Sequence, residues 1–155
     1  MKNHILRFKI YYNECLRHSN ILEKDYEKIK NLIPLSKNHI EDLLNDEEML
    51  MIFDQIAYRF IKFQDKLGKL LKSYFYVKGE NVEELTMIDI INIAEKKFSI
   101  TEDLWLELRY LRNSITHEYP NDYNDIAMAI NRVYQLLPVI KALLVEVKES
   151  DNLKW

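Results

Sequence analysis

Glycine, proline and cysteine are scarce in this sequence, and each scarcity excludes a class of protein. The 155 residues include 2 Gly and 3 Pro, so turns must be few and elements long, which excludes a many-turned sandwich or barrel. The single cysteine, Cys15, cannot form a disulfide within the chain and has no zinc-ligand spacing around it. We therefore expect an all-α protein in a reducing compartment, the cytoplasm.

Long apolar runs and a large excess of one charge are also missing. Charged residues interrupt the hydrophobic stretches and no apolar signal core follows the first residues, so we expect neither a membrane span nor a secretion signal. The formal net charge is -3 at pH 7, so any nucleic acid would be bound by a local basic patch. His, Asp and Glu form no compact cluster, and we expect no metal and no cofactor.

Apolar residues recur at steps of three and four through most of the chain, which is typical of amphipathic helices. The pattern predicts a long helix near residues 3–32 that Pro34 ends. Ser36 can cap a short helix to about residue 44, and Asp46 can cap a second long helix to about residue 77. The stretch 77–81 is the clearest break in the pattern.

The second half of the chain predicts two shorter helices and another long one. Thr86 and Asp89 have capping-box spacing and start a helix to about residue 98. Thr101 starts the next helix, which turns Trp105, Leu108 and Leu111 inward. The last helix begins near Asp122 and contains Pro138, which should kink it.

No repeat, low-complexity tract or linker divides these elements. We therefore expect one domain over residues 1–149, a single up-and-down bundle of about five helices with two or three long ones. Residues 150–155 are predicted to be a frayed tail.

Arg112 and His117 lie where the fifth predicted helix ends. On an unbroken helix, residues five apart differ by about 140° around the axis and face different ways. Pro120 disfavours helical geometry in the residue before it, and Thr116 bonds locally to the backbone. We therefore expect the helix to end between Asn113 and His117, so that the imidazole folds back beside the Arg112 guanidinium.

This grouping suits cleavage of a phosphodiester. A guanidinium offers a rigid fork of donors to phosphate oxygens as charge builds in the transition state, and an imidazole can take or give a proton near neutral pH. RNA carries its own nucleophile, the 2′-hydroxyl, so a metal is not needed. Tyr119 would project to the same side as His117, and Arg109, one turn before Arg112, would face the same cleft.

The same residues also have a structural interpretation. Arg112 would interact with nearby carboxylates, and His117 would cap the terminal carbonyls of its helix. Spacing alone favours this interpretation, because most such residues at helix ends are structural.

Residues 112–119 read Arg-Asn-Ser-Ile-Thr-His-Glu-Tyr. They resemble the Arg-x4-6-His signature of HEPN domains, in the Arg-x4-His-x-Tyr form of HepT-type toxins, and the polar Asn113 matches the usual form. The resemblance covers roughly residues 46–149. Residues 60–69 also resemble a helix of uncharacterised members encoded beside nucleotidyltransferases.

The resemblance implies a function. In that family a two-fold dimer places two motifs in one cleft and cleaves RNA without metal, which makes Arg112 and His117 catalytic, with Asn113 and Arg109 supporting. The family's tyrosine, here Tyr119, accepts AMP from a cognate MNT-type nucleotidyltransferase antitoxin. Two alternatives remain: a non-catalytic HEPN protein that binds nucleotide or the nucleotidyltransferase, and a purely structural helical adaptor.

A basic stripe with helical spacing precedes the motif in the sequence. Its members are Arg59, Lys62, Lys66, Lys69 and Lys72. The stripe is either a track that leads single-stranded RNA or tRNA to the cleft, or an ordinary solvated helix face. Asp65 within it either holds an arginine or histidine of the site or, as its spacing favours, pairs with Lys69. Gly68 costs about 1 kcal/mol in a helix, which close packing against the motif helix would offset.

Overall fold

The computed structural model describes residues 2–116 and 123–150 of the chain, and the elements in this part are all helical. The elements are α1 (Lys2–Glu27), η1 (Lys30–Leu32, a 3-10 helix), α2 (Lys37–Leu44), α3 (Glu47–Val77), α4 (Met87–Ala94), α5 (Glu102–Ile115) and α6 (Tyr123–Glu149). The predicted all-α class is confirmed. The described part has six α-helices rather than about five, and three of them are long.

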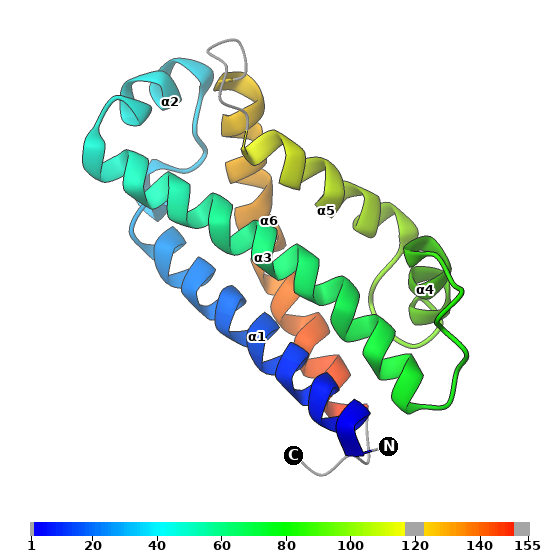
Figure 1. Cartoon of the computed structure of the whole chain (residues 1–155). Helices are drawn as coiled ribbons and strands as arrows, with labels where there is room; N and C mark the ends of the chain where they lie inside the picture. Colours follow the sequence, from blue (N-terminus) through cyan, green and yellow to red (C-terminus); the bar gives the residue numbers. More distant parts are fainter. Residues whose placement is uncertain (1, 117–122, 151–155) are drawn as a thin grey trace.

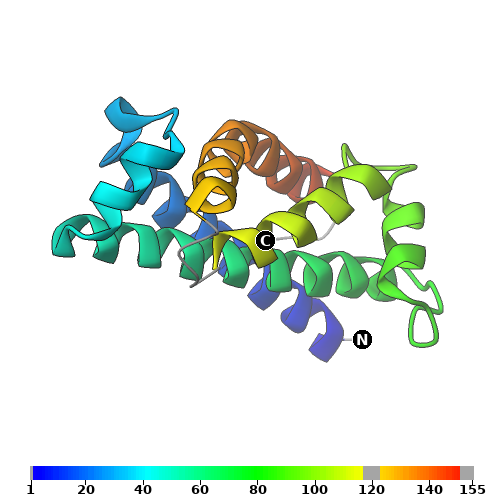
Figure 2. The same ribbon diagram turned by 90° about the horizontal axis from the view of Figure 1, so that it is seen from above.

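Four helices alternate in direction along the bundle, as Figure 1 shows for α1, α3, α5 and α6. They form a ring in which α1 contacts α3, α3 contacts α5, α5 contacts α6, and α6 returns to α1. In Figure 1 α3 runs between α1 and α5, and in the view from above α1 crosses behind α3 (Figure 2). The short helices lie at opposite ends, α2 against α3 and α6, and α4 against α3 and α5.

The starts of the helices follow the predicted capping residues. The Asp46 carboxylate accepts hydrogen bonds from the backbone N–H groups of residues 48 and 49 at 3.0 and 3.2 Å, so it satisfies two otherwise unpaired donors at the start of α3. Thr86 and Asp89 form a complete capping box at α4. Thr101 accepts from the backbone of residue 104 and starts α5.

Two predicted helix ends were wrong. The first helix stops at Glu27 instead of continuing to residue 32, because the chain tightens into bonds such as Ile29 N–H to the Tyr26 carbonyl at 3.0 Å. A step of three residues suits both the α-helix and the 3-10 helix, so the apolar pattern did not reveal the change. The helix α4 ends at Ala94 rather than near residue 98, and buried Phe98 follows in a turn.

The predicted last helix is present as α6 and continues through Pro138. Its predicted start at Asp122 lies outside the described residues. Contrary to the sequence-based expectation, α6 is long and apolar enough to cross a membrane by length and composition. A single such helix is weak evidence, because core helices of soluble proteins meet the same criterion, and 44% of its most apolar window is buried inside the bundle.

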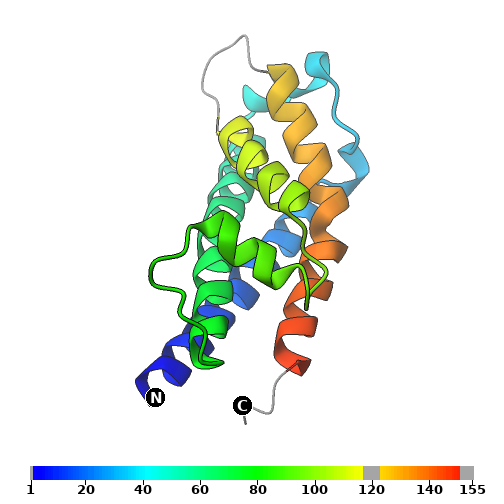
Figure 3. The ribbon, with the colours of Figure 1, turned by 90° about the vertical axis from the view of Figure 1, so that its right-hand side faces the viewer.

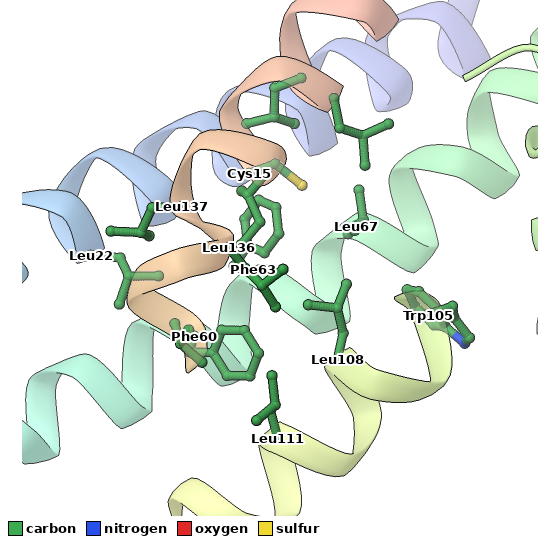
Figure 4. Close-up of a cluster of buried hydrophobic side chains, with 14 of the residues drawn as sticks. Cys15, Leu22, Phe60, Phe63, Leu67, Trp105, Leu108, Leu111, Leu136 and Leu137 are labelled. Carbon is green, nitrogen blue, oxygen red and sulfur yellow. The ribbon is translucent and has the colours of Figure 1, made fainter. Parts of the chain in front are cut away.

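The core lies inside the ring and is built from large apolar side chains of all four helices (Figure 4). The labelled members are Cys15, Leu22, Phe60, Phe63, Leu67, Trp105, Leu108, Leu111, Leu136 and Leu137. Burial of each large side chain contributes about 1.5–3 kcal/mol relative to exposure. The predicted inward face of α5, with Trp105, Leu108 and Leu111, is thus confirmed. Cys15 is buried in the same core, and this burial raises the pKa of its thiol.

Polar contacts fix α5 against α6, which lie side by side (Figure 3). Arg132 of α6 donates to both carboxylate oxygens of Glu107 of α5, at 2.9 and 3.0 Å. A two-pronged contact of this kind restricts the relative orientation of the helices. The helix that carries the motif arginine is therefore held from the α6 side as well as by the core.

Candidate functional site

The site begins at the C-terminal end of α5. This helix ends at Ile115, and Thr116 is its C-cap residue. The Thr116 hydroxyl donates to the backbone carbonyls of Arg112 and Asn113, both at 3.3 Å. The side chain thereby satisfies carbonyls that the last turn leaves unpaired. The prediction that the motif helix ends between Asn113 and His117 is confirmed.

Arg112 reaches across from α5 to α3. Its Nη1 donates to the Asp65 carboxylate at 2.7 Å and to the Gln64 side-chain oxygen at 3.2 Å. The side chains of Arg112 and Asp65 are 40% and 36% exposed, whereas Gln64 is 4% exposed. A short charge-assisted bond and a bond to a buried amide restrict the guanidinium at the surface, where α3 meets α5.

The contacts of Arg112 leave part of its donor fork available. Both hydrogen bonds use Nη1, and within the described ranges neither Nε nor Nη2 donates to another atom. Because a guanidinium presents five N–H donors in a fixed plane, the remaining edge can bind an anion without breaking the bond to Asp65.

Asp65 holds an arginine of the site, which is the role that its sequence spacing favoured less. The four-residue spacing favoured a pair with Lys69, and that expectation was wrong, because the carboxylate binds Arg112 instead. An intrahelical spacing could not reveal a partner 47 positions away in the sequence.

Sequence reasoning missed Gln64. It lies four residues after Phe60 and three before Leu67, both buried on α3. A polar residue at a position with core spacing was the available signal, because such a side chain needs a hydrogen-bond partner when buried.

Gly68 sets the close approach of α3 to α5. A Cβ added to Gly68 would lie 3.2 Å from Cη2 of Trp105 on α5 and 3.1 Å from Cε of Met87 on α4. The predicted packing against the motif helix is confirmed. Gly68 comes one turn after Gln64 and Asp65, so this contact brings α5 close to the two residues that Arg112 must reach.

The other motif residues are described only in part. Arg109 and Asn113 are exposed on α5. His117 and Tyr119 lie outside the described residues, and so does the predicted approach of the imidazole to Arg112. The side chains of the described part form no group of three or more His, Cys, Asp or Glu that could hold a metal ion.

Two members of the predicted basic stripe pack against α1. Lys66 forms a 3.0 Å salt bridge with Glu14, whose hydrogen bond raises the pKa of Lys66. Arg59 lies 3.1 Å from the ring nitrogen of His18, measured from Nη1 to Nδ1. Burial, followed by the charge of Arg59, lowers the pKa of His18. These two cations therefore belong to a polar seam between α1 and α3.

The other members share a helix face with Asp65. Lys62, Lys69 and Lys72 lie three or four residues from Asp65 or from one another, a spacing that gathers them on one helix face. The Lys62 ammonium lies 5.6 Å from the centroid of the Tyr58 ring. The structure thus divides the predicted RNA-binding set, with Lys62 and Lys69 on the helix face of Asp65 and Arg59 and Lys66 in the seam.

Comparison with known proteins identifies no relative. No family model, no curated protein and no solved structure matches the chain. A function is therefore inferred from the contacts of Arg112, the helical architecture and the motif at residues 112–119.

Proposed function

We propose that this chain is a HEPN-type, metal-independent endoribonuclease whose catalytic residues are Arg112 and His117. The observation that carries the proposal is the guanidinium of Arg112, held at the surface by Asp65 and Gln64 with a donor edge to which no other described residue binds. An oriented cation of this kind suits a phosphate whose negative charge grows in the transition state. The end of α5 at Ile115 supports the proposal, because the proposed site requires the motif helix to end before residue 117.

The proposed reaction uses the substrate's own nucleophile. The 2′-hydroxyl attacks the adjacent phosphorus, the bond from phosphorus to the 5′-oxygen breaks, and the products carry a 2′,3′-cyclic phosphate and a 5′-hydroxyl. His117 would remove the proton from the 2′-hydroxyl or return one to the leaving 5′-oxygen. Arg112 would stabilise the phosphorane oxygens, with Arg109 and Asn113 supporting it on exposed positions of α5.

A homodimer belongs to this proposal for a chemical reason. One imidazole performs one proton transfer at a time, whereas the reaction needs both a base and an acid. A two-fold axis through the cleft would supply a second His117 and a second Arg112.

The proposed biological role follows from the resemblance of residues 112–119 to HepT-type toxins. The chain would be a cytoplasmic toxin that cleaves single-stranded RNA or tRNA. A cognate MNT-type nucleotidyltransferase would neutralise it by transferring AMP from ATP to the Tyr119 hydroxyl, with release of pyrophosphate.

A second function has one observation in its favour. The 2.7 Å pair with Asp65 neutralises part of the Arg112 charge, which suits a site that holds a phosphate without cleaving it. The chain would then be a non-catalytic HEPN protein that binds nucleotide or the nucleotidyltransferase.

Expression of the full chain alone tests the proposal in cells. We expect growth arrest and fragmentation of total RNA, and we expect Arg112→Ala and His117→Ala each to relieve both while helicity stays unchanged. Lys37→Ala, on exposed α2, serves as a control that should stay toxic. Undiminished toxicity of both motif variants would reject the catalytic assignment, and intact RNA with normal growth would favour the binding protein.

Incubation with the partner nucleotidyltransferase and ATP tests the silencing step. We expect intact mass spectrometry to detect one or more added adenylyl groups, and we expect Tyr119→Phe to remove them. Modification that persists in Tyr119→Phe would assign the acceptor elsewhere.

A further inference from the structure

A groove of about 330 Å³ lies near the start of α1, and none of its lining residues belongs to the Arg112 contact. It is bounded by α1, the second half of α3 and the segment that follows α3. Its lining residues are His4, Arg7, Tyr11, Lys69, Lys72, Ser73, Tyr76, Val82 and Glu83.

The charge of the groove is locally positive. Arg7, Lys69 and Lys72 face a single carboxylate, that of Glu83. Throughout the described ranges none of these three cations forms a salt bridge. The chain as a whole has a formal net charge of -3, so this groove departs from the average surface in the direction that favours an anion.

Aromatic rings lie among the cations. The Tyr76 ring stands against the His4 ring with centroids 4.3 Å apart, and Tyr11 is half-buried on the α1 side. Sites for single-stranded nucleic acid combine a basic groove for the backbone with aromatic rings on which bases stack. A groove for a simple anion would need only the cations.

The groove is also aligned with Arg112. Asp65, which holds Arg112, is followed on α3 by Lys69, Lys72 and Tyr76 at steps of four, three and four residues. This spacing keeps all four on one helix face. At a rise of 1.5 Å per residue, the α3 side of the groove lies about 6–17 Å along the helix from Asp65. One short strand of nucleic acid can reach both places.

We propose that the groove binds an unpaired nucleotide of an RNA single strand whose scissile phosphate lies at Arg112. Lys69, Lys72 and Arg7 bind the backbone phosphates, and Tyr76 and Tyr11 contact a base. The inference rests on the proposed ribonuclease function and names its substrate as single-stranded rather than paired RNA. The groove is a binding site only and takes no part in bond cleavage.

Binding of an uncleavable strand tests the groove. The probe is a fluorescent 2′-O-methyl oligouridine of about 12 nucleotides, a length within the range of known single-strand sites. The 2′-O-methyl group removes the nucleophile, so binding is measured without cleavage. Fluorescence anisotropy gives Kd at several salt concentrations for the full-length chain and its variants.

The double variant Lys69→Ala/Lys72→Ala is expected to bind more weakly and to depend less on salt. Loss of two phosphate contacts should lower the slope of log Kd against log salt by about 1.4, since each contact contributes about 0.7 for a single strand. The matched control is Lys24→Ala/Lys37→Ala, which removes the same charge from exposed positions at the other end of the bundle. An equal change of Kd and slope in both double variants would overturn the proposal.

Tyr76→Ala is expected to weaken binding about fivefold or more through lost stacking, while Tyr76→Phe keeps the wild-type Kd. If Tyr76→Ala does not fold, the lysine variants decide. Equal affinity for a duplex of the same length would overturn the single-strand assignment.

Cleavage measured in parallel separates the two proposals. Wild-type protein that binds through the groove but leaves unmodified RNA intact would refute the ribonuclease and retain the groove. Cleavage that Arg112→Ala abolishes, with Kd unchanged in Lys69→Ala/Lys72→Ala, would refute the groove and retain the ribonuclease.

Discussion

At the scale of single residues, the pair between Arg112 and Asp65 orients a side chain more than it stabilises the fold. Both side chains are more than a third exposed, so solvent screens their attraction and the pair contributes at most about 1 kcal/mol. The bond to buried Gln64 adds a second direction from which the guanidinium is held. The contact therefore serves to position the Arg112 guanidinium rather than to stabilise the fold.

Asp65→Ala should lower RNA cleavage by about ten- to a hundredfold, because a misplaced catalytic group can cost about that much. Thermal unfolding should change little. Steady-state cleavage of a fluorescent RNA and circular dichroism measure the two effects.

The matched control is Glu107→Ala, which removes the partner of Arg132 in a pair of nearly equal exposure, 35% for Glu107 and 43% for Arg132. Glu107→Ala should lose about as little stability as Asp65→Ala does, and it should keep full RNA cleavage. An equal loss of cleavage in both variants would show that Asp65 acts on the fold rather than on Arg112.

At the scale of elements, the approach of α3 to α5 depends on Gly68. Alanine in place of glycine favours a helix by about 1 kcal/mol. Here the new methyl group would press on Trp105, which is 3% exposed and has little room to move. Overpacking of a core costs about 1–3 kcal/mol, so the steric effect should win.

Gly68→Ala alone should therefore destabilise the bundle, by about 1 kcal/mol as the difference of these two effects. In a Trp105→Phe background the nearest ring atom is gone and only the flexible end of Met87 must move, so the same substitution should become stabilising. Urea unfolding of the four proteins in this cycle measures both changes. A Gly68→Ala effect of the same sign and size in both backgrounds would contradict the packing argument.

The seam between α1 and α3 predicts a dependence of stability on pH. Burial, and next the charge of Arg59, lowers the pKa of His18 below its ordinary 6.5. As pH falls below about 6.5, the unfolded chain takes up a proton before the folded chain does, so stability is lost with falling pH. His18→Gln should remove this part of the loss.

Unfolding free energies at pH 7 and pH 5 test the seam. Wild type should lose more stability between these values than His18→Gln does, whereas His39→Gln on exposed α2 should behave as wild type. The same loss of stability in wild type and His18→Gln would contradict the predicted effect of His18 on the pH dependence.

The starts of the helices were predicted well, because they depend on contacts between residues that are close in the sequence. Caps such as Asp46, Thr86 and Thr101 start their helices as expected, because each bonds to backbone within three residues. Helix ends were predicted less well, because buried residues such as Ile29 and Phe98 keep helical spacing beyond the last helical turn.

The candidate site was predicted only as a set of residues. The periodicity of α3 identified a basic stripe but could not show that α1 takes up Arg59 and Lys66. It also could not show that Arg112 and Gln64 come together from two helices. Contacts between distant segments depend on how the bundle closes, which local sequence does not specify.

At the scale of the whole molecule, Arg112 contacts Asp65 where α3 and α5 meet, and the groove beside α1 lies further along the same face of α3. The proposed ribonuclease thus has Arg112 and its strand-binding groove along one face of α3, where a second copy of the chain can complete the cleft.

Cleavage of a defined single-stranded RNA by the purified protein in the presence of EDTA decides whether the chain is a metal-independent ribonuclease. Mass spectrometry identifies the new ends, and Arg112→Ala and His117→Ala serve as paired variants. Wild-type protein should produce 2′,3′-cyclic phosphate and 5′-hydroxyl ends, and neither variant should produce them. Intact RNA with wild type, or the same products with both variants, would contradict the proposed function.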